Sequence, residues 1–473
     1  MSIRSSQIVW LGVGELLNRG AVFGLFFFAV AWLDKASLAN YLVLFSFANI
    51  CWSGAQLGTG MHGIRRLATI DDAIVRRVKA MEVVALRLVI TPIIAVIAGV
   101  VAIQLFDATL GAGILVAVLV FARAPQVDWI LRALSDYSRL AIISVIAACL
   151  SLLIGYFVIR SGRSVDAMLF SHIIPLAIVA IGSWMAVLRV WSPRSLLQVV
   201  GRLHPLSELG GAATIGICGF LALVTQALPL FWLRLMSELE AAAEFGSVLR
   251  IIQAALGVVT VLSFVHYPAL TRSLRSPQAS LLSAFDRYLA DLVTMSCLFL
   301  IVVFALDNLI ADWLKIDDRA TRVLLAFACA APAYFIRSSL SDLQIATGGA
   351  RDLLNIFLLA LIVSVVLCAL LLPAADNLFR AAALAAIVGE YVVISQLAVK
   401  LSKDPDMAWI RPRIVGVIIF VIVLLVTSLG LMYQTSDDIT KFLKLAVTIA
   451  AVSGFVLSVR RGTIGGWLSG GQQ

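Results

Sequence analysis

The chain has 473 residues, of which 62% are hydrophobic and 13% are charged, and its mean hydropathy is +1.03. A composition this apolar excludes a soluble globular protein, and its recurring runs of about 20 apolar residues are long enough to cross a bilayer as helices. The net charge of +9 sits mainly in short loops beside these runs, so it indicates membrane topology and not nucleic-acid binding. The alternating segments of an outer-membrane barrel are missing from the sequence, which therefore predicts an all-α polytopic membrane protein.

We predict about fourteen transmembrane helices in chain order. The first seven are Ile8–Leu33, Leu38–Gly60, Val83–Phe106, Leu110–Leu131, Leu140–Ile159, Met168–Val190 and Gly210–Leu233. The second seven are Ala243–Pro268, Leu289–Ile310, Val323–Ile345, Leu353–Leu372, Ala381–Val399, Ile414–Tyr433 and Phe442–Val459. The loops at 194–208 and 280–292 have amphipathic patterns and are predicted to be interfacial helices.

The lysines and arginines predict the orientation of these helices. Most of the 36 fall in the even-numbered loops and at the two ends of the chain, including "RR" at 65–66, "RRVK" at 76–79 and "RR" at 460–461. The positive-inside rule places such loops in the cytoplasm, so both termini are expected there.

A weak internal repeat divides the chain into two lobes. "LANYLVLFSFANICWSGAQ" in the second helix aligns with "AAEFGSVLRIIQAALGVVT" in the eighth at an offset of 204, and "APQVDWILRALSD" in the fourth resembles "APAYFIRSSLSD" in the tenth. A shift of six helices preserves direction, so the repeats are parallel and are related by an axis along the membrane normal. We predict a first lobe at 1–190, a cytoplasmic linker at 191–209, a second lobe at 210–400 and two extra helices at 401–473.

Polar residues inside the spans predict a cationic cavity. A charged side chain at mid-bilayer costs about 2.5–3.5 kcal/mol on insertion scales, so it is retained where it pairs or lines water. The arginines predicted to bind an anionic cargo are Arg19, Arg123, Arg250 and Arg337. The predicted polar lining consists of Asn18, Asn49, Gln56, Gln126 and Gln253. Arginine suits phosphate because its planar fork stays charged and donates two parallel hydrogen bonds.

The other charged residues of the spans have predicted roles near this cavity. Glu15 and Glu390 are candidates for a coupling-ion site or for counter-ions of the arginines, and Glu15 with Arg19 can equally be a structural pair. The candidate cytoplasmic gate residues are Asp128, Arg132 and Asp342. Arg87 and Arg132 lie near predicted cytoplasmic ends, where snorkelling to the interface is the simpler interpretation. His172 and His266 are interpreted as packing residues, and Pro125 and Pro332 as helix-bending elements.

The sequence contains no recognisable catalytic motif. It has no nucleotide-binding P-loop, no nucleophile elbow and no HExxH, and its six cysteines fall inside predicted spans without metal-ligand spacing. We therefore expect no catalytic residue, no metal site and no cofactor.

Two stretches resemble a known family. "GELLNRGAVFGLFFFAVAWLDKASLANYLVLFSFANICWSGAQLGTGMHGIRRLA" (14–68) looks like the opening of Wzx-type polysaccharide flippases, with an early arginine, a tyrosine at the start of the second helix and a basic exit after glycines. "SELEAAAEFGSVLRIIQAALGVVTVLSFVHYPAL" (237–270) is similar to the region of the seventh and eighth helices in that family. These flippases belong to the multidrug/oligosaccharidyl-lipid/polysaccharide exporter superfamily.

The resemblance implies a transporter in the bacterial inner membrane. Its cargo would be an undecaprenyl-pyrophosphate-linked oligosaccharide for O-antigen, capsule or exopolysaccharide synthesis. This cargo would be moved from the cytoplasmic to the periplasmic face by alternating access, with membrane lipids, a polysaccharide polymerase and chain-length proteins as partners. Two alternatives stay open: a multidrug-type antiporter for small molecules or cations in the same superfamily, and a non-transporting subunit of a polysaccharide synthase.

Overall fold

The computed structural model describes residues 5–68, 70–134, 136–200, 203–274, 278–375, 377–404, 411–433 and residue 447. Within these residues every regular element is helical, and 11 helices are long and apolar enough to cross a membrane. Two shorter apolar helices cover Leu110–Phe121 and Ile422–Met432. The predicted all-α polytopic fold is confirmed, whereas the predicted span Phe442–Val459 lies, apart from residue 447, outside the described residues.

The chain divides into two compact units. Unit 1 comprises Met1–Val224 and Arg234–Ala243, and unit 2 comprises Thr225–Leu233 and Glu244–Gln473. The lobe boundaries predicted from the sequence remain predictions beside this division.

In the described residues, unit 1 contains nine complete helices, a 3-10 turn, both ends of α10 and the first residues of α11. In chain order these are α1 (Ser5–Trp32), α2 (Lys35–Gln56), α3 (Thr59–Ala68), α4 (Ala73–Phe106), α5 (Leu110–Phe121), α6 (Asp128–Ala133), α7 (Tyr137–Gly162), α8 (Val165–Val190), α9 (Pro193–Val200), η1 (Pro205–Glu208) and both ends of α10 (Leu209–Leu235). Several N-termini are capped by a side-chain oxygen, as at Asp34, Asp72, Thr109 and Ser164. A buried apolar cluster that includes Val83, Trp129, Trp191 and Leu196 binds α4, α6, α8 and α9 together.

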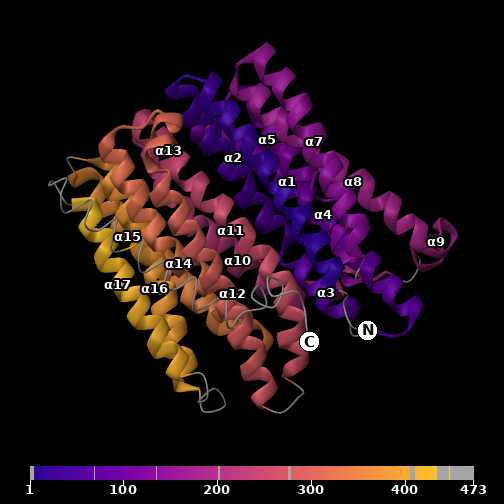
Figure 1. Ribbon diagram of the computed structural model, residues 1–473. Coiled ribbons are helices and arrows are strands. Elements are labelled where there is room, and N and C mark those ends of the chain that lie inside the picture. Colours follow the sequence, from indigo (N-terminus) through magenta and orange to yellow (C-terminus); the bar gives the residue numbers. More distant parts are fainter. Residues whose placement is uncertain are drawn as a thin grey trace. The chain divides into compact units, whose positions relative to one another are not determined.

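Unit 2 contains the remaining helices. These are α11 (Leu239–Ser273), which starts in unit 1, then α12 (Gln278–Ala305), α13 (Asp307–Leu314), α14 (Asp318–Ala346), α15 (Ala350–Ala374), α16 (Leu378–Lys403) and α17 (Arg411–Tyr433). α16 packs between α15 and α17, and α14 contacts α12, α16 and α17 (Figure 1). The 280–292 segment is the start of the long helix α12, so its prediction as a separate interfacial helix is wrong.

Two predicted spans are interrupted in the structure. The second predicted helix ends at Gln56, where Leu57 and Gly58 adopt positive φ angles of 46° and 66° before α3 begins. The fourth ends at Phe121, and helical structure resumes only at Asp128. Each segment is two helices where the sequence predicted one.

Pro125 accounts for the second interruption. Proline has no N–H to donate to the carbonyl four residues earlier, and its ring clashes with that carbonyl. Here the Phe121 carbonyl accepts from Ala124 N instead, at 2.8 Å, in a tight turn. Pro332, by contrast, lies inside the uninterrupted helix α14.

Candidate functional site

Two of the predicted cargo-binding arginines are partly buried in unit 1. Arg123 lies in the turn after α5, and its guanidinium carbon is 5.5 Å from the centre of the Trp52 ring. Arg19 lies on α1 and is also partly buried. A partly buried guanidinium favours a bound anion, because it stays charged and donates several hydrogen bonds. Arg19 and Arg123 are therefore the candidate anion-binding residues of unit 1.

A third arginine of unit 1 is more buried than either. The Arg87 side chain is 2% exposed; its Nε donates to Thr59 Oγ1 at 2.7 Å and its Nη1 to the Gln126 carbonyl at 3.1 Å. Its guanidinium carbon lies 5.4 Å from the centre of the Trp129 ring, and Asp128 attracts its charge. Arg87 thus connects α4 to both interrupted helices, and the snorkelling interpretation is wrong. The cause is the length of α4, which begins at Ala73 and places residue 87 well inside the helix.

Two of the predicted polar lining residues bind the backbone of the fold. Gln126 Nε2 donates to the Leu176 carbonyl at 3.1 Å, and Asn49 Nδ2 donates to the Phe45 carbonyl at 2.9 Å. Gln56 is partly buried at the end of α2. These hydrogen bonds to backbone carbonyls hold the side-chain amides of Gln126 and Asn49 in position.

Two further predicted residues lie on α1. Asn18 is partly buried, one residue before Arg19. The side chain of Glu15 lies outside the described residues, so the Glu15–Arg19 pair stays a prediction.

Asp128 and Arg132 pair with one another on α6. Arg132 Nη2 lies 3.0 Å from Asp128 Oδ2, in i,i+4 spacing, and the two side chains are 12% and 21% exposed for Arg132 and Asp128, respectively. The gate role predicted for them remains a prediction.

In unit 2, Arg337 and Glu390 form a buried ion pair between α14 and α16. Arg337 Nη1 lies 2.8 Å from Glu390 Oε2, and their side chains are 14% and 2% exposed. The guanidinium carbon is 5.6 Å from the ring centres of both Tyr334 and Phe357. The structure thus brings Glu390 together with a predicted cargo-binding arginine, which is the arrangement that its predicted counter-ion role requires. Its predicted coupling-ion role stays a prediction.

Several buried polar atoms of unit 2 have no hydrogen-bond partner among the described residues. One is Glu390 Oε1, the carboxylate oxygen that does not face Arg337, and others are the hydroxyls of Tyr334 and Ser364. Gly389 lies close to Ser364, because a Cβ added there would meet Ser364 Oγ at 2.3 Å. This part of α14, α15 and α16 therefore combines a buried ion pair with further buried polar atoms.

The remaining predicted site residues of unit 2 lie on α11 and α14. Arg250 Nη1 donates to Gln253 Oε1 at 2.7 Å along α11. Asp342 Oδ2 accepts from the hydroxyl of Tyr288 at 2.7 Å, and that hydroxyl also lies 2.5 Å from Ser263 Oγ. Asp342 is 8% exposed, so the predicted gate residue belongs to a buried hydroxyl network.

The two buried histidines have polar partners. His172 Nε2 lies 2.7 Å from the Tyr41 hydroxyl, and its ring stacks on Phe45 with centroids 4.0 Å apart. His266 Nε2 lies 2.8 Å from Asp291 Oδ2. Both are packed, hydrogen-bonded residues, as the sequence predicted.

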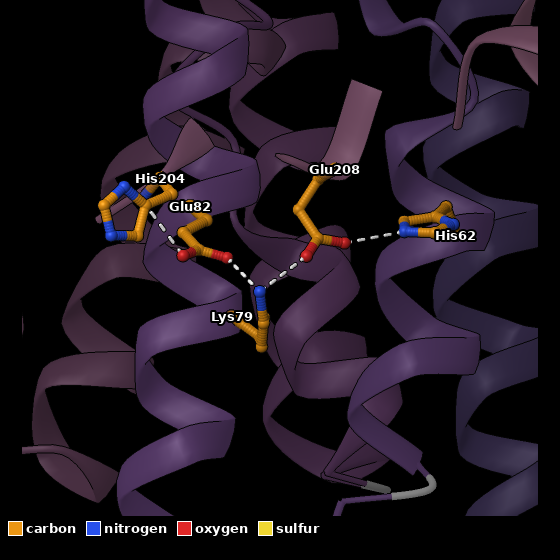
Figure 2. Close-up of polar contacts among 5 residues, drawn as sticks. All are labelled: His62, Lys79, Glu82, His204 and Glu208. Atoms are coloured by element: carbon orange, nitrogen blue, oxygen red, sulfur yellow. Dashed lines mark hydrogen bonds and ion pairs between the residues drawn. The ribbon is translucent and has the colours of Figure 1, made fainter. Parts of the chain in front are cut away.

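A charged network that the sequence did not predict joins the linker to α3 and α4 within unit 1 (Figure 2). Glu208 accepts from His62 Nε2 at 2.8 Å and pairs with Lys79 Nζ at 3.0 Å. Lys79 also lies 2.7 Å from Glu82, whose other oxygen accepts from the His204 backbone N–H at 3.0 Å. Glu208 and Glu82 are 4% and 1% exposed, and we call these contacts the linker clamp.

The burial of Glu208 is compensated by its partners. Burial opposes ionisation, but the hydrogen bonds and charges of His62 and Lys79 outweigh it and hold the pKa of Glu208 below its ordinary value. A sequence signal for the clamp existed in Glu82, a carboxylate one residue before a predicted span. Its partners are up to 122 residues away along the chain, so the sequence does not identify them.

Among the described residues, no group of three His, Cys, Asp or Glu side chains is arranged to hold a metal ion. The six cysteines are free thiols, and four of them are buried.

Solved structures with this arrangement of helices are MATE transporters. A MATE transporter in complex with MaD3S matches with a TM-score of 0.63 and 16% identity, over 87% of this chain and 96% of that one. The eukaryotic MATE transporter AtDTX14 matches with a TM-score of 0.59 and 10% identity, over 87% and 98%. The chain has the MATE fold.

Another solved structure of the same fold is described by the polarity of its binding pocket. A MOP superfamily transporter from Pyrococcus furiosus, described as having a binding pocket of reverse polarity that suggests a different function, matches with a TM-score of 0.60 and 14% identity over 87% of this chain and 96% of that one. No protein-family profile matches the chain, and no curated protein sequence matches it significantly. Over 87% of its length the chain therefore has the polytopic helical fold of these structures.

Proposed function

We propose that this MATE-fold chain is a lipid-linked oligosaccharide flippase of the Wzx type. It moves undecaprenyl-pyrophosphate-linked repeat units from the cytoplasmic to the periplasmic face of the bacterial inner membrane by alternating access. The observation that carries the proposal is the burial of two arginines of unit 1: Arg19 and Arg123 are both partly buried, and the guanidinium carbon of Arg123 lies 5.5 Å from the centre of the Trp52 ring. Such a site favours an anion with several oxygens, and a pyrophosphate supplies them.

In this proposal Arg337 is a second cargo-binding arginine and Glu390 is its counter-ion. The 2.8 Å ion pair keeps Arg337 charged and oriented when no cargo is bound. Protonation of Glu390 would free the guanidinium for an anion. Arg250, which is now hydrogen-bonded to Gln253, is the fourth predicted cargo-binding arginine. Membrane lipids hold the prenyl tail, and the polymerase and chain-length proteins act on the product.

The alternative function is export of small molecules or cations. It is favoured by the fold itself, because the solved neighbours include a multidrug resistance MATE family transporter. The two functions predict opposite charge selectivity: the arginines favour an anionic cargo, whereas a cationic drug requires acidic residues.

Reconstituted liposomes distinguish these functions. We expect the purified chain to flip a fluorescent undecaprenyl-pyrophosphate-linked oligosaccharide and to leave a cationic dye behind. Arg123→Ala and Arg19→Ala should each lower the initial flipping rate by about 10-fold or more, since each removes a charge-assisted bond. Arg194→Ala, which removes an exposed arginine of α9, is the matched control and should keep the wild-type rate.

Two outcomes would overturn the proposal. Dye transport without flipping would favour the multidrug-type antiporter, and absence of both activities would favour a non-transporting synthase subunit. Normal flipping by both arginine variants would refute the anion site.

A further inference from the structure

The two sequence repeats carry a histidine at the same place. His266 follows His62 by 204 residues, which is the offset of the repeat. His62 Nε2 is 2.8 Å from Glu208 Oε2, within unit 1. His266 Nε2 is 2.8 Å from Asp291 Oδ2, within unit 2. Each unit therefore has its own contact between a histidine ring and a carboxylate.

The two carboxylates belong to different kinds of segment. Asp291 lies on α12, so the packing of a 28-residue helix fixes it beside His266. Glu208 lies in the linker, in the short turn η1 before α10. Position 87 of α4, which precedes Asp291 by the same 204 residues, is an arginine. Unit 1 therefore takes the carboxylate for its histidine from the linker.

The linker clamp attaches segment 203–208 to α3 and α4 at both ends of the segment (Figure 2). The His204 backbone N–H donates to α4 at one end, and the Glu208 carboxylate contacts α3 and α4 at the other. Leu206, between these two points, is 72% exposed, so its side chain adds little apolar burial. The strength of the clamp therefore decides how firmly this segment is held.

The charges of the clamp do not balance while His62 is neutral. Glu208 and Glu82 bring two buried carboxylates, and Lys79 brings one ammonium between them. Buried charge is costly unless it is compensated, so the excess negative charge favours uptake of a proton. His62 is the side chain of the clamp that can take this proton near neutral pH, because histidine ordinarily gains its charge between about pH 8 and pH 5. Its side chain is 17% exposed, so protons can reach it from water.

The charged groups that face His62 come from the linker and α4. Glu208 contacts the ring directly, Lys79 lies 3.0 Å from the same carboxylate, and Glu82 lies 2.7 Å from Lys79. Further charged groups on the elements packed against α3 have partners of their own, namely Arg76 and Arg87 of α4 and the pair Asp128–Arg132 of α6. The proton state of His62 is therefore coupled to Glu208 before any other group.

We propose that His62 is a proton-binding site that controls the docking of the linker. A proton on His62 converts its hydrogen bond to Glu208 into a charge-assisted one, which is stronger. Since the docked linker favours the protonated ring, the protonated ring favours the docked linker to the same extent. Proton uptake therefore strengthens the attachment of segment 203–208 to α3 and α4, and proton loss weakens it. The positive-inside rule places the linker in the cytoplasm, so the pH that acts on this site is the cytoplasmic pH.

Spin labels on the linker and on α4 report the docking directly. Ser207 and Ala73 are exposed, and each is changed to cysteine in the full chain without its six native cysteines. We expect the ratio of docked to released linker to rise about 5-fold between about pH 8 and pH 6, which is what a charge-assisted hydrogen bond adds over a neutral one. His62→Gln keeps a donor but does not take up a proton, so its ratio should not change over this range.

His266→Gln is the matched control. It removes the equivalent histidine of unit 2, whose carboxylate partner is not in the linker, and should keep the wild-type pH response. The same pH response in His62→Gln as in the wild type would overturn the proposal. Loss of the response in His266→Gln, or its absence from the wild type, would overturn it too.

A second variant leaves His62 in place. Lys79→Gln removes a cation that repels the proton and leaves two carboxylates that attract it, so the midpoint of the docking transition should move to higher pH. If Lys79 were only a structural contact, its loss would lower the docked fraction at every pH without raising the midpoint. A midpoint that stays in place or falls would therefore contradict the proposal, even where His62→Gln does not fold.

Discussion

The linker clamp and the ion pairs Lys35–Glu240 and Arg234–Asp107 all join a carboxylate to a cation, but their carboxylates differ in burial. Glu208 and Glu82 are 4% and 1% exposed, whereas Glu240 and Asp107 are 70% and 82% exposed. A buried carboxylate that loses its partner leaves a desolvated charge behind, while an exposed one exchanges its partner for water. The comparison teaches that burial decides how costly a carboxylate–cation contact in this chain is to break.

The largest expected effect comes from the close packing of Gly216, on α10, against the turn between α2 and α3. Gly216→Leu should destabilise the protein by about 3 kcal/mol, because the new side chain would overlap backbone atoms of residues 57 and 58. Thermal unfolding in detergent measures this. Gly210→Leu on the same helix is the control, since a Cβ there meets nothing within 4 Å. Equal stability of the two variants would show that α10 does not pack closely against residues 57 and 58.

Removal of the clamp carboxylate should have the next largest effect. Glu208→Ala leaves Lys79 and His62 without their shared acceptor and should cost about 2 kcal/mol of stability. Glu240→Ala, which removes an exposed carboxylate, should leave the unfolding temperature unchanged. A loss of stability from Glu240→Ala as large as that from Glu208→Ala would break the comparison.

Acid should weaken the clamp specifically. The pKa of Glu208 lies below its ordinary value of 4.5 in the folded protein, so its ionised form stabilises the fold above that value. This stabilisation is lost as the pH falls through the depressed folded pKa. The wild type should therefore lose more stability between about pH 5 and pH 3 than Glu208→Gln does. Parallel pH profiles of the two proteins would rule out this linkage.

Salt should have the smallest effect, and only at the exposed Lys35–Glu240 pair. Raising the ionic strength from about 0.1 M to 1 M shortens the Debye length from about 10 Å to 3 Å, which screens exposed charges. The distance between spin labels at Ala36→Cys and Ala241→Cys, beside this pair, should become longer or more broadly distributed. Hydrogen exchange of the 203–208 segment, held by the clamp, should stay the same. Increased exchange there would mean that the clamp is also exposed.

The sequence predicted the helices well and their breaks poorly. Apolar runs determine where a chain crosses lipid, so the spans follow from composition alone. Pro125 and Pro332 were both predicted to bend helices, yet only Pro125 ends one. The span containing Pro332 has 89% of its apolar window buried, and helix packing there holds α14 continuous. The presence of a proline in the sequence does not show whether the surrounding helices keep its own helix continuous.

The sequence identified which residues of the candidate site are functional candidates, but it did not identify which residues they pair with. Arg19, Arg123 and Arg337 stood out because charge is rare in lipid. The 53-residue separation of Arg337 and Glu390 and the buried role of Arg87 depend on which helices touch. Contacts between distant helices are set by tertiary packing, which a single sequence does not show.

The interruption at Pro125 has a consequence for how the chain tolerates change. The carbonyls freed by the break are bound from two other helices: Trp184 Nε1 donates to the Pro125 carbonyl at 2.7 Å, and Arg87 donates to that of Gln126 at 3.1 Å. Replacing the proline would therefore not simply rebuild a straight helix. In a straight helix these two carbonyls would accept hydrogen bonds from the helix backbone, and the Trp184 indole and the buried Arg87 guanidinium would each lose an acceptor. The break is maintained by its neighbours as much as by the proline, which makes it a joint property of α4, α8 and the turn that carries Arg123.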